Sequence, residues 1–453
     1  MKLLYESCKE KEKRLIEHIT NQVCGDYIYD YPPRQAYRRF DSDFDYEKVI
    51  VQSFDMSDEL NLYFHFPFCK QICSYCNLFA VCDTNPEHFK EYFEILEKEL
   101  DYYLPYISQK KINTIYLGGG TPSWISASMF RDFFDMLERK LNVCVKDVIE
   151  VSVEMSPDTT QPEHLRQYVE AGINRVNIGV QAVDNGELSC IGRHYSEQMI
   201  FQALSNVMSA GFDNVCVDLI YGLEGQSMDS WKRSLEMVVS YEPPTICPYP
   251  LTLRDNTGFS ARGYLSLDGC EQYDKYEYAR DFLLDHGYIQ ETHVRFKKID
   301  SHGGYVQKEN HWKQQNILGL GAGARSYLKL INYRNGYSVM HRKKAYNQYI
   351  GLIREKGCAI IDGFAMNQDE RMRKMLVLGL NGLSIDQFEM EYGMDPLKMF
   401  PNEFSAMLKL NLFEVIDNHI VLTQKGVKYR DLIVQLFFSD NVNRLVYEHS
   451  YNE

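Results

Sequence analysis

Three cysteines stand close together at a spacing that suits metal chemistry. Cys69, Cys73 and Cys76 follow the pattern C-x3-C-x2-C, directly after the apolar run NLYFHFPF. Three thiolates can hold three irons of a [4Fe–4S] cubane and leave the fourth iron open, and soft sulfur ligands favour iron–sulfur clusters or zinc. A zinc site normally takes a fourth ligand, for which Cys82 and His65 are near. The spacing favours a cluster, with zinc and chance burial of three thiols as the alternatives.

The other nine cysteines are scattered along the chain. Twelve cysteines in 453 residues are too few for a disulfide scaffold. We expect the nine to be small buried hydrophobes, because most of them sit in apolar or mixed segments. They are Cys8, Cys24, Cys82, Cys144, Cys190, Cys216, Cys247, Cys270 and Cys358.

The elements that must position the cysteine triplet follow a repeated pattern. From about residue 60, short β-rich runs alternate with amphipathic stretches, which predicts βα units with parallel strands. Six such units favour an α/β fold, a partial (β/α)6 TIM barrel whose active site lies at the carboxyl ends of the strands. The expected strands are 61–66, 114–117, 149–154, 175–180, 215–220 and 245–249, and the clearest expected helices are 87–103, 129–140 and 230–241.

We expect three parts in the chain. Residues 1–55 read as an N-terminal covering arm, and residues 56–335 as the barrel with its extension. Residues 355–453 favour a small helical, winged-helix-like C-terminal domain. Within it, the stretch LFEVIDNHIVLTQKGVKY predicts two short strands around an Asp-Asn turn.

The composition narrows the class of partner. The formal net charge of −14 provides no basic field for a phosphate backbone, so we expect a small-molecule substrate and no nucleic acid. No apolar run reaches the roughly 18 residues that a membrane span needs, and the charged start is unlike a signal peptide. We therefore expect a cytoplasmic monomer that does not bind membranes.

The cysteine triplet and the strand before it resemble a known family. The pattern after Tyr63-x-His-x-Pro-Phe is similar to the signature of the radical S-adenosylmethionine (SAM) superfamily, and NLYFHFPFCKQICSYCN resembles its coproporphyrinogen dehydrogenase, or HemN-like, branch. The resemblance runs in order through most of residues 60–330 and extends to the C-terminal region. It implies a [4Fe–4S] cluster whose open iron is chelated by SAM, and a 5′-deoxyadenosyl radical that abstracts hydrogen. The electron would come from a donor such as flavodoxin or ferredoxin.

The resemblance also implies which residues meet the cofactors. An acid at the end of the third expected strand, Glu154, suits the cationic SAM, and the family uses the equivalent acid in this way. The family uses the equivalents of Gln181, Arg193 and Asp218 to hold a second SAM molecule or the substrate side. The expected catalytic residues are Tyr63, Cys69, Cys73 and Cys76, and the expected SAM contacts are Tyr63, Tyr75, Gly119, Gly120, Thr121, Glu154, Gln181, Arg193 and Asp218.

The match departs from the family on the substrate side. Leu78 replaces the fourth cysteine of the coproporphyrinogen enzymes, and Arg325 stands where they have an apolar residue. We therefore rank C-methylation or cyclopropanation of a small metabolite, with a second SAM as carbon donor, ahead of coproporphyrinogen decarboxylation. Haem chaperones rank third, because their His-Asn-x-x-Tyr-Trp is replaced by Asn-His-Trp at 310–312. Candidates for the substrate side are Tyr31, Gln290, Arg295, His302 and Tyr305.

Overall fold

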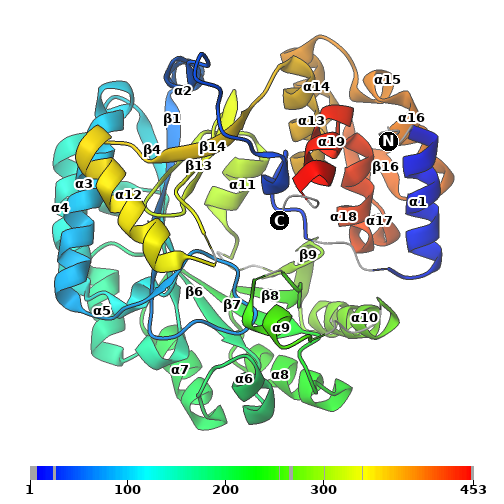
Figure 1. Ribbon diagram of the computed structural model, residues 1–453. Helices are drawn as coiled ribbons and strands as arrows, with labels where there is room; N and C mark the ends of the chain where they lie inside the picture. Colours follow the sequence, from blue (N-terminus) through cyan, green and yellow to red (C-terminus); the bar gives the residue numbers. More distant parts are fainter. Residues whose placement is uncertain are drawn as a thin grey trace.

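A twelve-stranded sheet organises the larger part of the molecule (Figure 1). The computed structural model describes residues 8–23, 27–254, 256–264, 269–299, 301, 303–338 and 340–449; Cys24 and His302 lie outside these ranges. The strands follow the order β14-β13-β12-β11-β1-β4-β5-β6-β7-β8-β10-β9.

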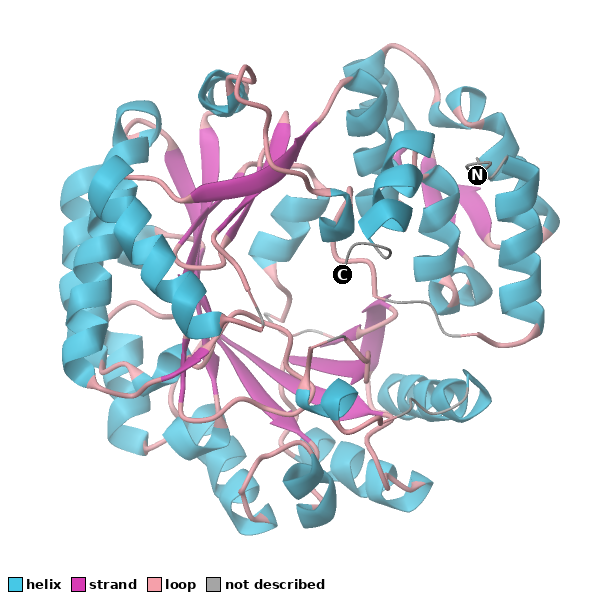
Figure 2. Cartoon of the chain, viewed as in Figure 1, coloured by secondary structure: helices cyan, strands magenta, loops and turns pink. Residues whose placement is uncertain are grey.

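Six parallel neighbours form the centre of this sheet. They are β1 (Glu59–Phe66), β4 (Lys111–Gly119), β5 (Glu150–Met155), β6 (Arg175–Gln181), β7 (Asn214–Tyr221) and β8 (Thr245–Pro250). Helices cover their outer side, as Figure 2 shows in cyan around the magenta strands. These helices are α3 (Pro86–Ile107), α4 (Ala127–Leu141), α5 (Pro162–Glu170), α6 (Asn185–Cys190), α7 (Glu197–Ser209), α8 (Met228–Ser240) and α10 (Gly269–Asp285). The predicted partial (β/α)6 barrel is confirmed.

Local sequence signals explain where these helices begin. Asn85 caps α3 by accepting a hydrogen bond from the Glu87 amide, and Ser126 caps α4 by accepting one from the Met129 amide. In α4 the buried residues recur at helical spacing, so one face packs on the sheet. They are Ala127, Phe130, Phe133, Phe134, Met136, Leu137 and Leu141.

The sheet continues beyond the six strands on both sides. β11 (Ile317–Leu320) pairs parallel with β1, and β12 (Arg325–Tyr327), β13 (Ile331–Asn335) and β14 (Ile360–Ala365) follow it antiparallel. On the other edge, β10 (Arg295–Lys298) and β9 (Tyr288–Thr292) pair antiparallel beyond β8. The return of the chain to the β1 edge was not predicted. A separate two-stranded pair joins β2 (Phe68–Cys69) to β3 (Val81–Cys82).

The floor of the barrel is closed by α11 (Val306–Trp312) and the turn before it. Glu150, the first residue of β5, accepts hydrogen bonds from the amides of Val306 and Gln307. Asn310 donates to the Asn61 side chain of β1, at 2.9 Å. The amino-terminal ends of the strands are thus sealed, and the carboxyl ends are left for a site.

The C-terminal region is helical and carries a small sheet of order β15-β17-β16. Its strands are β15 (Leu383–Ser384), β16 (Phe413–Ile416) and β17 (His419–Leu422); Asp417 and Asn418 turn between the last two with φ of 48° and 61°. This is the hairpin predicted around the Asp-Asn turn. The helices are α13 (Gln368–Gly379), α14 (Ile385–Tyr392), α15 (Pro396–Met399), α16 (Pro401–Lys409), α17 (Gln424–Lys428), α18 (Arg430–Ile433) and α19 (Asp440–His449).

The N-terminal segment lies against both parts. α1 (Cys8–Thr20) packs beside α16 and α18, at the right of Figure 1. The 3-10 turn η1 (Arg34–Ala36) contacts α19, and α2 (Tyr46–Asp55) contacts α3. The remaining described helices are α9 (Gly258–Ala261), α12 (Arg342–Lys356), η2 (Pro122–Trp124), η3 (Val145–Asp147), η4 (Pro157–Thr159) and η5 (Val434–Phe437). The division of the chain at 55, 335 and 355 stays a prediction. None of the described helices combines the length and the apolar character that a bilayer crossing requires.

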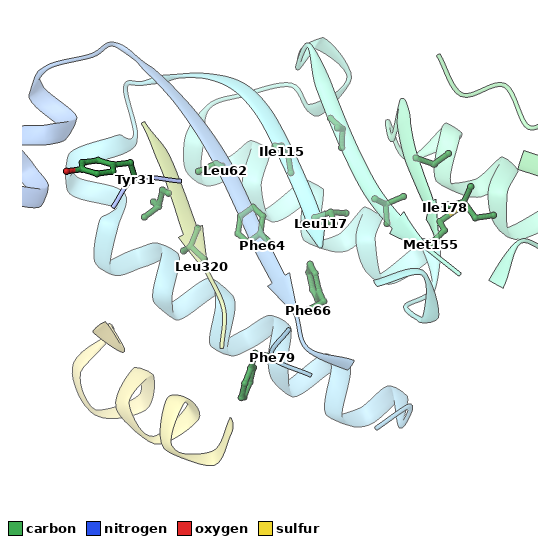
Figure 3. Packing of buried hydrophobic residues seen from close by; sticks show 14 of the residues in the cluster. Tyr31, Leu62, Phe64, Phe66, Phe79, Ile115, Leu117, Met155, Ile178 and Leu320 are labelled. Carbon is green, nitrogen blue, oxygen red and sulfur yellow. The ribbon is translucent and has the colours of Figure 1, made fainter. Parts of the chain in front are cut away.

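Aromatic side chains fill the layer between strands and helices. Phe66 at the end of β1 contacts the rings of Tyr92, Phe93, Phe130 and Phe133, with centroid distances between 5.4 and 6.2 Å. Figure 3 shows Phe66 with its apolar neighbours on β1, β4 and β11. This packing fixes the strand end that leads into the cysteine triplet.

A buried carboxyl group ties the added strands to the barrel. Glu99 on α3 is fully buried and accepts hydrogen bonds from the Gly321 amide, the Asn335 side chain and the Tyr349 hydroxyl. Burial raises the pKa of Glu99 from 4.5 to about 7, against the opposing effect of these three donors.

We predict that Glu99→Gln removes a pH-dependent loss of stability. Between about pH 4.5 and 7 the folded chain keeps a proton on Glu99 that the unfolded chain releases, so wild-type stability falls as pH rises through this window. The variant should lack this component, worth up to about 3 kcal/mol. Urea unfolding at both ends of the window measures it. Glu389→Gln, at an exposed position on α14, is the matched control. Equal pH dependence in wild type and Glu99→Gln would contradict the prediction.

Candidate cluster and SAM site

A cavity of about 940 Å³ opens at the carboxyl ends of the barrel strands. The strands alternate, so every second side chain of β1 to β8 points inward, and many of these are polar. The structure brings all of the residues predicted for the cluster and SAM to the wall of this cavity. They are Tyr63, Cys69, Cys73, Tyr75, Cys76, Gly119, Gly120, Thr121, Glu154, Gln181, Arg193 and Asp218.

The loop that carries the cysteine triplet is held from outside. The Ser74 amide donates to the Ile191 carbonyl, and the Phe259 amide donates to the Ser74 carbonyl. Arg342 of α12 donates to the backbone carbonyls of Cys76 and Leu78. Three separate segments of the chain therefore hold the loop in place.

The three thiols suit a cluster better than a single ion. Within the described residues, the sulfurs of Cys69, Cys73 and Cys76 do not form a group whose atoms all lie within 4.8 Å of one another. Tetrahedral zinc would hold its sulfurs about 3.8 Å apart, whereas a cubane places each thiolate on its own iron. Burial raises the pKa of Cys69 to about 12 and that of Cys76 to about 11, so these thiols stay neutral until a cation binds.

The two residues considered as a fourth zinc ligand have other environments. His65 Nε2 contacts the Phe79 carbonyl at 2.7 Å and its Nδ1 contacts the Tyr63 hydroxyl at 2.9 Å. Burial lowers the pKa of His65 to about 4, so the ring is neutral and engaged on both sides. Cys82 is exposed, and it is the register partner of Cys69 in the short parallel pair β2–β3.

The glycine turn after β4 owes its composition to close contacts. A Cβ on Gly120 would lie 2.4 Å from the Phe68 carbonyl oxygen, and Gly119 has a φ of 117°. The Gly119 amide donates to Glu154 at 2.9 Å, and the Tyr116 hydroxyl donates to the other oxygen of that carboxylate. Burial raises the pKa of Glu154. A carboxylate buried in this way is suited to receive an ammonium group.

Arg193 links the cluster loop to β6. Its guanidinium donates to the Gly179 carbonyl and, through Nε, to the Cys73 sulfur at 3.5 Å. Gln181 ends β6 with a φ of 71°. Its side-chain amide nitrogen lies over Gly179. Asp218 on β7 accepts a hydrogen bond from Asn177, and burial raises its pKa to about 7.

Several residues that line the cavity are not predicted from the sequence. Arg175 begins β6, is 2% exposed, and places its guanidinium 4.2 Å from the ring of Tyr305. The period-2 pattern Arg175, Asn177, Gly179, Gln181 was the available signal, since these four share the inward face. Arg34, Arg254 and Lys308 also line the cavity, but they come from segments without strand periodicity.

Some expectations about single residues are wrong. Tyr31 lies away from the cavity because its hydroxyl bonds the Glu370 carboxylate, and Gln290 donates to the Tyr276 hydroxyl instead. Arg295 and Tyr305 do line the cavity. Three scattered cysteines expected to be buried are exposed, because they stand at element ends: Cys82, Cys144 and Cys270.

Comparisons with known proteins agree with this geometry. A family model described as the radical SAM superfamily matches residues 63–238. The heme chaperone HemW of Lactococcus lactis subsp. lactis is 30% identical over 392 residues, which cover 84% of this chain and 98% of that protein. The heme chaperone HemW of Bacillus subtilis is 30% identical over 373 residues, which cover 80% and 95%. The chain belongs to the HemN/HemW branch of the radical SAM superfamily.

A solved structure of this branch has the same fold. Coproporphyrinogen III oxidase (HemN) from Escherichia coli, a radical SAM enzyme, aligns with a TM-score of 0.79 over 92% of this chain and 99% of that chain, at 22% identity. As a radical SAM protein of this branch, the chain uses a [4Fe–4S] cluster and SAM as cofactors. The resemblance, the fold class and these cofactors are confirmed, while the role of each wall residue stays a prediction.

The expected order of functions changes. The haem chaperones were ranked last because residues 310–312 depart from their motif. In the structure Asn310 bonds Asn61, and His311 lies 3.3 Å from the Asp30 carboxylate. Both residues therefore pack at the floor of the barrel, and their departure from the motif does not argue against a haem chaperone. The long matches to HemW proteins therefore favour the haem chaperone over methyl transfer.

We predict that Cys73→Ala abolishes cluster assembly. Two thiolates cannot fix the cubane, so the protein reconstituted with iron and sulfide should lose most of its iron and its visible absorbance. Cys144→Ala, at an exposed cysteine, should keep both. Cys82→Ala should also keep both, and loss of iron in that variant would make Cys82 a ligand.

We predict that Arg193→Met makes the cluster harder to reduce. The substitution removes a hydrogen-bond donor and a positive charge beside the Cys73 sulfur. The reduced cluster is more negative than the oxidised one, so losing this charge destabilises the reduced state more. The midpoint potential should fall by an amount on the order of tens of millivolts, with iron content unchanged. Redox titration monitored by EPR measures it, with Arg233→Met on the exposed face of α8 as control. An unchanged potential would show that Arg193 does not tune the cluster.

Proposed function

We propose that this protein binds haem in the barrel cavity and acts as a haem chaperone, with SAM and the cluster beside the haem. The observation that carries the proposal is the similarity to HemW proteins over nearly their whole length. At about 940 Å³ the cavity lies near the upper end of the roughly 300–1,000 Å³ common for ligand pockets, which suits a large ligand.

The cavity wall offers flat apolar surfaces. The rings of Tyr63 and Tyr116 stack at 5.9 Å, and those of Tyr116 and Tyr305 stack at 5.5 Å. On the side of the N-terminal segment, Tyr29 and Tyr327 lie 5.9 Å apart. Aromatic faces of this kind support a planar macrocycle by dispersion and burial of apolar area.

The same wall offers cations to a ligand with carboxylates. Burial lowers the pKa of the Arg34 guanidinium, and the nearby guanidinium groups of Arg325 and Arg254 lower it further. All three guanidinium groups line the cavity, so an anionic ligand bound there would be attracted to this side of the wall. The two propionates of haem are of this class, and Arg325 is the residue that departs from the coproporphyrinogen enzymes.

The chain's own residues prepare the SAM side. Glu154 would receive the ammonium group of SAM, and the turn of Gly119, Gly120 and Thr121 would lie along it. When bound, the cluster supplies an electron for reductive cleavage of SAM, taken from a donor such as flavodoxin or ferredoxin. α11 packs across the opposite end of the barrel.

Radical catalysis is the second candidate. Gln181, Arg193 and Asp218 lie on the cavity wall with the cluster cysteines, as a second SAM or a reacting substrate requires. C-methylation or cyclopropanation of a small metabolite, and decarboxylation of coproporphyrinogen, belong to this candidate.

We predict saturable haem binding at one haem per chain. Titration of the anaerobically reconstituted protein should shift the Soret band of haem. Arg325→Gln and Arg34→Gln should each weaken the affinity by about tenfold, the loss of one charge-assisted hydrogen bond. Arg233→Gln on the surface should bind as wild type. The absence of a Soret shift in the wild type would overturn the proposal.

Product analysis separates the chaperone from the enzymes. With reductant and SAM, liquid chromatography with mass detection quantifies 5′-deoxyadenosine and S-adenosylhomocysteine. Haem capture without multiple-turnover product supports the chaperone. Both products in excess over protein would favour methyl transfer, and deoxyadenosine with conversion of coproporphyrinogen would favour the decarboxylase.

A further inference from the structure

A second group of metal-ligating side chains lies inside the barrel, apart from the cluster cysteines. Cys216 and Asp218 stand two residues apart on β7, and Cys247 on β8 is the register partner of Asp218. Side chains at these positions share the inward face of the sheet, and all three line the cavity. From the sequence alone, both cysteines are expected to be ordinary buried hydrophobes. Both are buried, but the register brings them together.

The spacing of the three ligand atoms suits one ion. Within the described part of the chain, this is the group of three whose atoms all lie within 4.8 Å of one another. The two sulfurs are 3.5 Å apart, and the Cys216 sulfur lies 3.8 Å from an Asp218 oxygen. A tetrahedral zinc ion, with bonds of about 2.3 Å to sulfur and about 2.0 Å to oxygen, would hold such atoms roughly 3.5 to 3.8 Å apart.

The same pair does not form a disulfide in the structure. Both are free cysteines, and their sulfurs lie 3.5 Å apart, well beyond the roughly 2.0 Å of a disulfide bond. An ion between the sulfurs joins them without moving either strand.

The surroundings support a charged site. The Asn177 side chain donates to Asp218 and fixes the carboxylate on the wall. The Arg175 guanidinium faces the same group and acts electrostatically on both Cys216 and Asp218. Binding of a divalent cation would release the two thiol protons and leave two thiolates, one carboxylate and the cation. Arg175 acts on this negative charge, and it is also paired with the buried Glu150 carboxylate at 3.8 Å.

We propose that Cys216, Asp218 and Cys247 bind one zinc-class divalent cation whose fourth position is open to the cavity. On this assignment Asp218 holds the ion in place of the second SAM molecule that the family resemblance implies. Two thiolates select a borderline-soft ion over magnesium or calcium. Three protein ligands with one open position are the arrangement of reactive rather than purely structural zinc sites. The open position holds water or a donor atom of the molecule in the cavity. The proposal does not depend on haem binding.

Cobalt(II) is the probe for this site. The holoprotein, reconstituted with iron and sulfide and kept in its oxidised state, is EPR-silent at the cluster, so added cobalt is observed directly. We expect one equivalent of cobalt, with a high-spin signal and sulfur-to-cobalt charge-transfer bands in the difference spectrum, displaced by one equivalent of zinc. Cys216→Ser and Cys247→Ser should each lose the charge-transfer intensity and at least tenfold in affinity. Cys358→Ser, at a buried cysteine elsewhere, should behave as wild type.

Two controls keep the test decisive. Iron content and far-ultraviolet circular dichroism, unchanged in the variants, show that fold and cluster are intact. If a serine variant fails to fold, Asp218→Asn and the wild-type stoichiometry decide instead. A wild type that retains no zinc or cobalt after gel filtration, or cobalt spectra identical in wild type and variants, would overturn the proposal. Failure of haem titration would leave it standing.

Discussion

Two backbone hydrogen bonds between the end of β1 and the turn after β4 set the position of the whole site. The Gly120 amide donates to the Phe66 carbonyl, and the Thr121 amide donates to the Phe68 carbonyl, both at 2.8 Å. Because only glycine fits against Phe68 at position 120, the turn and the strand end approach closely. The Cys69 sulfur is thereby held 3.7 Å from the Thr121 hydroxyl, beside the turn that leads to Glu154. A slip of one residue in this pairing would turn Tyr63 out of the barrel.

Periodicity made the barrel and most of the cluster and SAM wall predictable. Each expected strand lies within an observed one or overlaps it, because short apolar runs between amphipathic stretches have few other solutions. The spacing of the three cysteines, the place of Glu154 at the end of its strand and the family resemblance for Asp218 predicted these residues, and the parallel strands bring them to one cavity. For these residues, the order of strands along the chain was enough to predict that the side chains lie close together.

The missed features depend on distances that the order of residues does not encode. Cys216 and Cys247 meet only because β7 and β8 pair in one register, which no local pattern specifies. Tyr31 was expected in the cavity, but its hydroxyl satisfies the buried carboxylate of Glu370 on α13. Residues 310 and 311 depart from the haem chaperone motif, but Asn310 bonds Asn61 of β1 and His311 lies beside Asp30, so these two residues pack under the barrel. In each case a buried polar group found its partner in a distant segment.

The place of β11 next to β1 has a consequence for the order of synthesis. β1 is the first strand of the barrel to leave the ribosome, but its second neighbour is made only after β4 to β10. Until then one edge of the growing sheet offers unpaired amide and carbonyl groups. The cysteine triplet, Glu154 and Asp218 are all made before that edge is covered. The nascent chain therefore carries the three predicted cluster cysteines on a sheet that is still open, and the Glu99 contact to Gly321 forms only when β11 covers that edge.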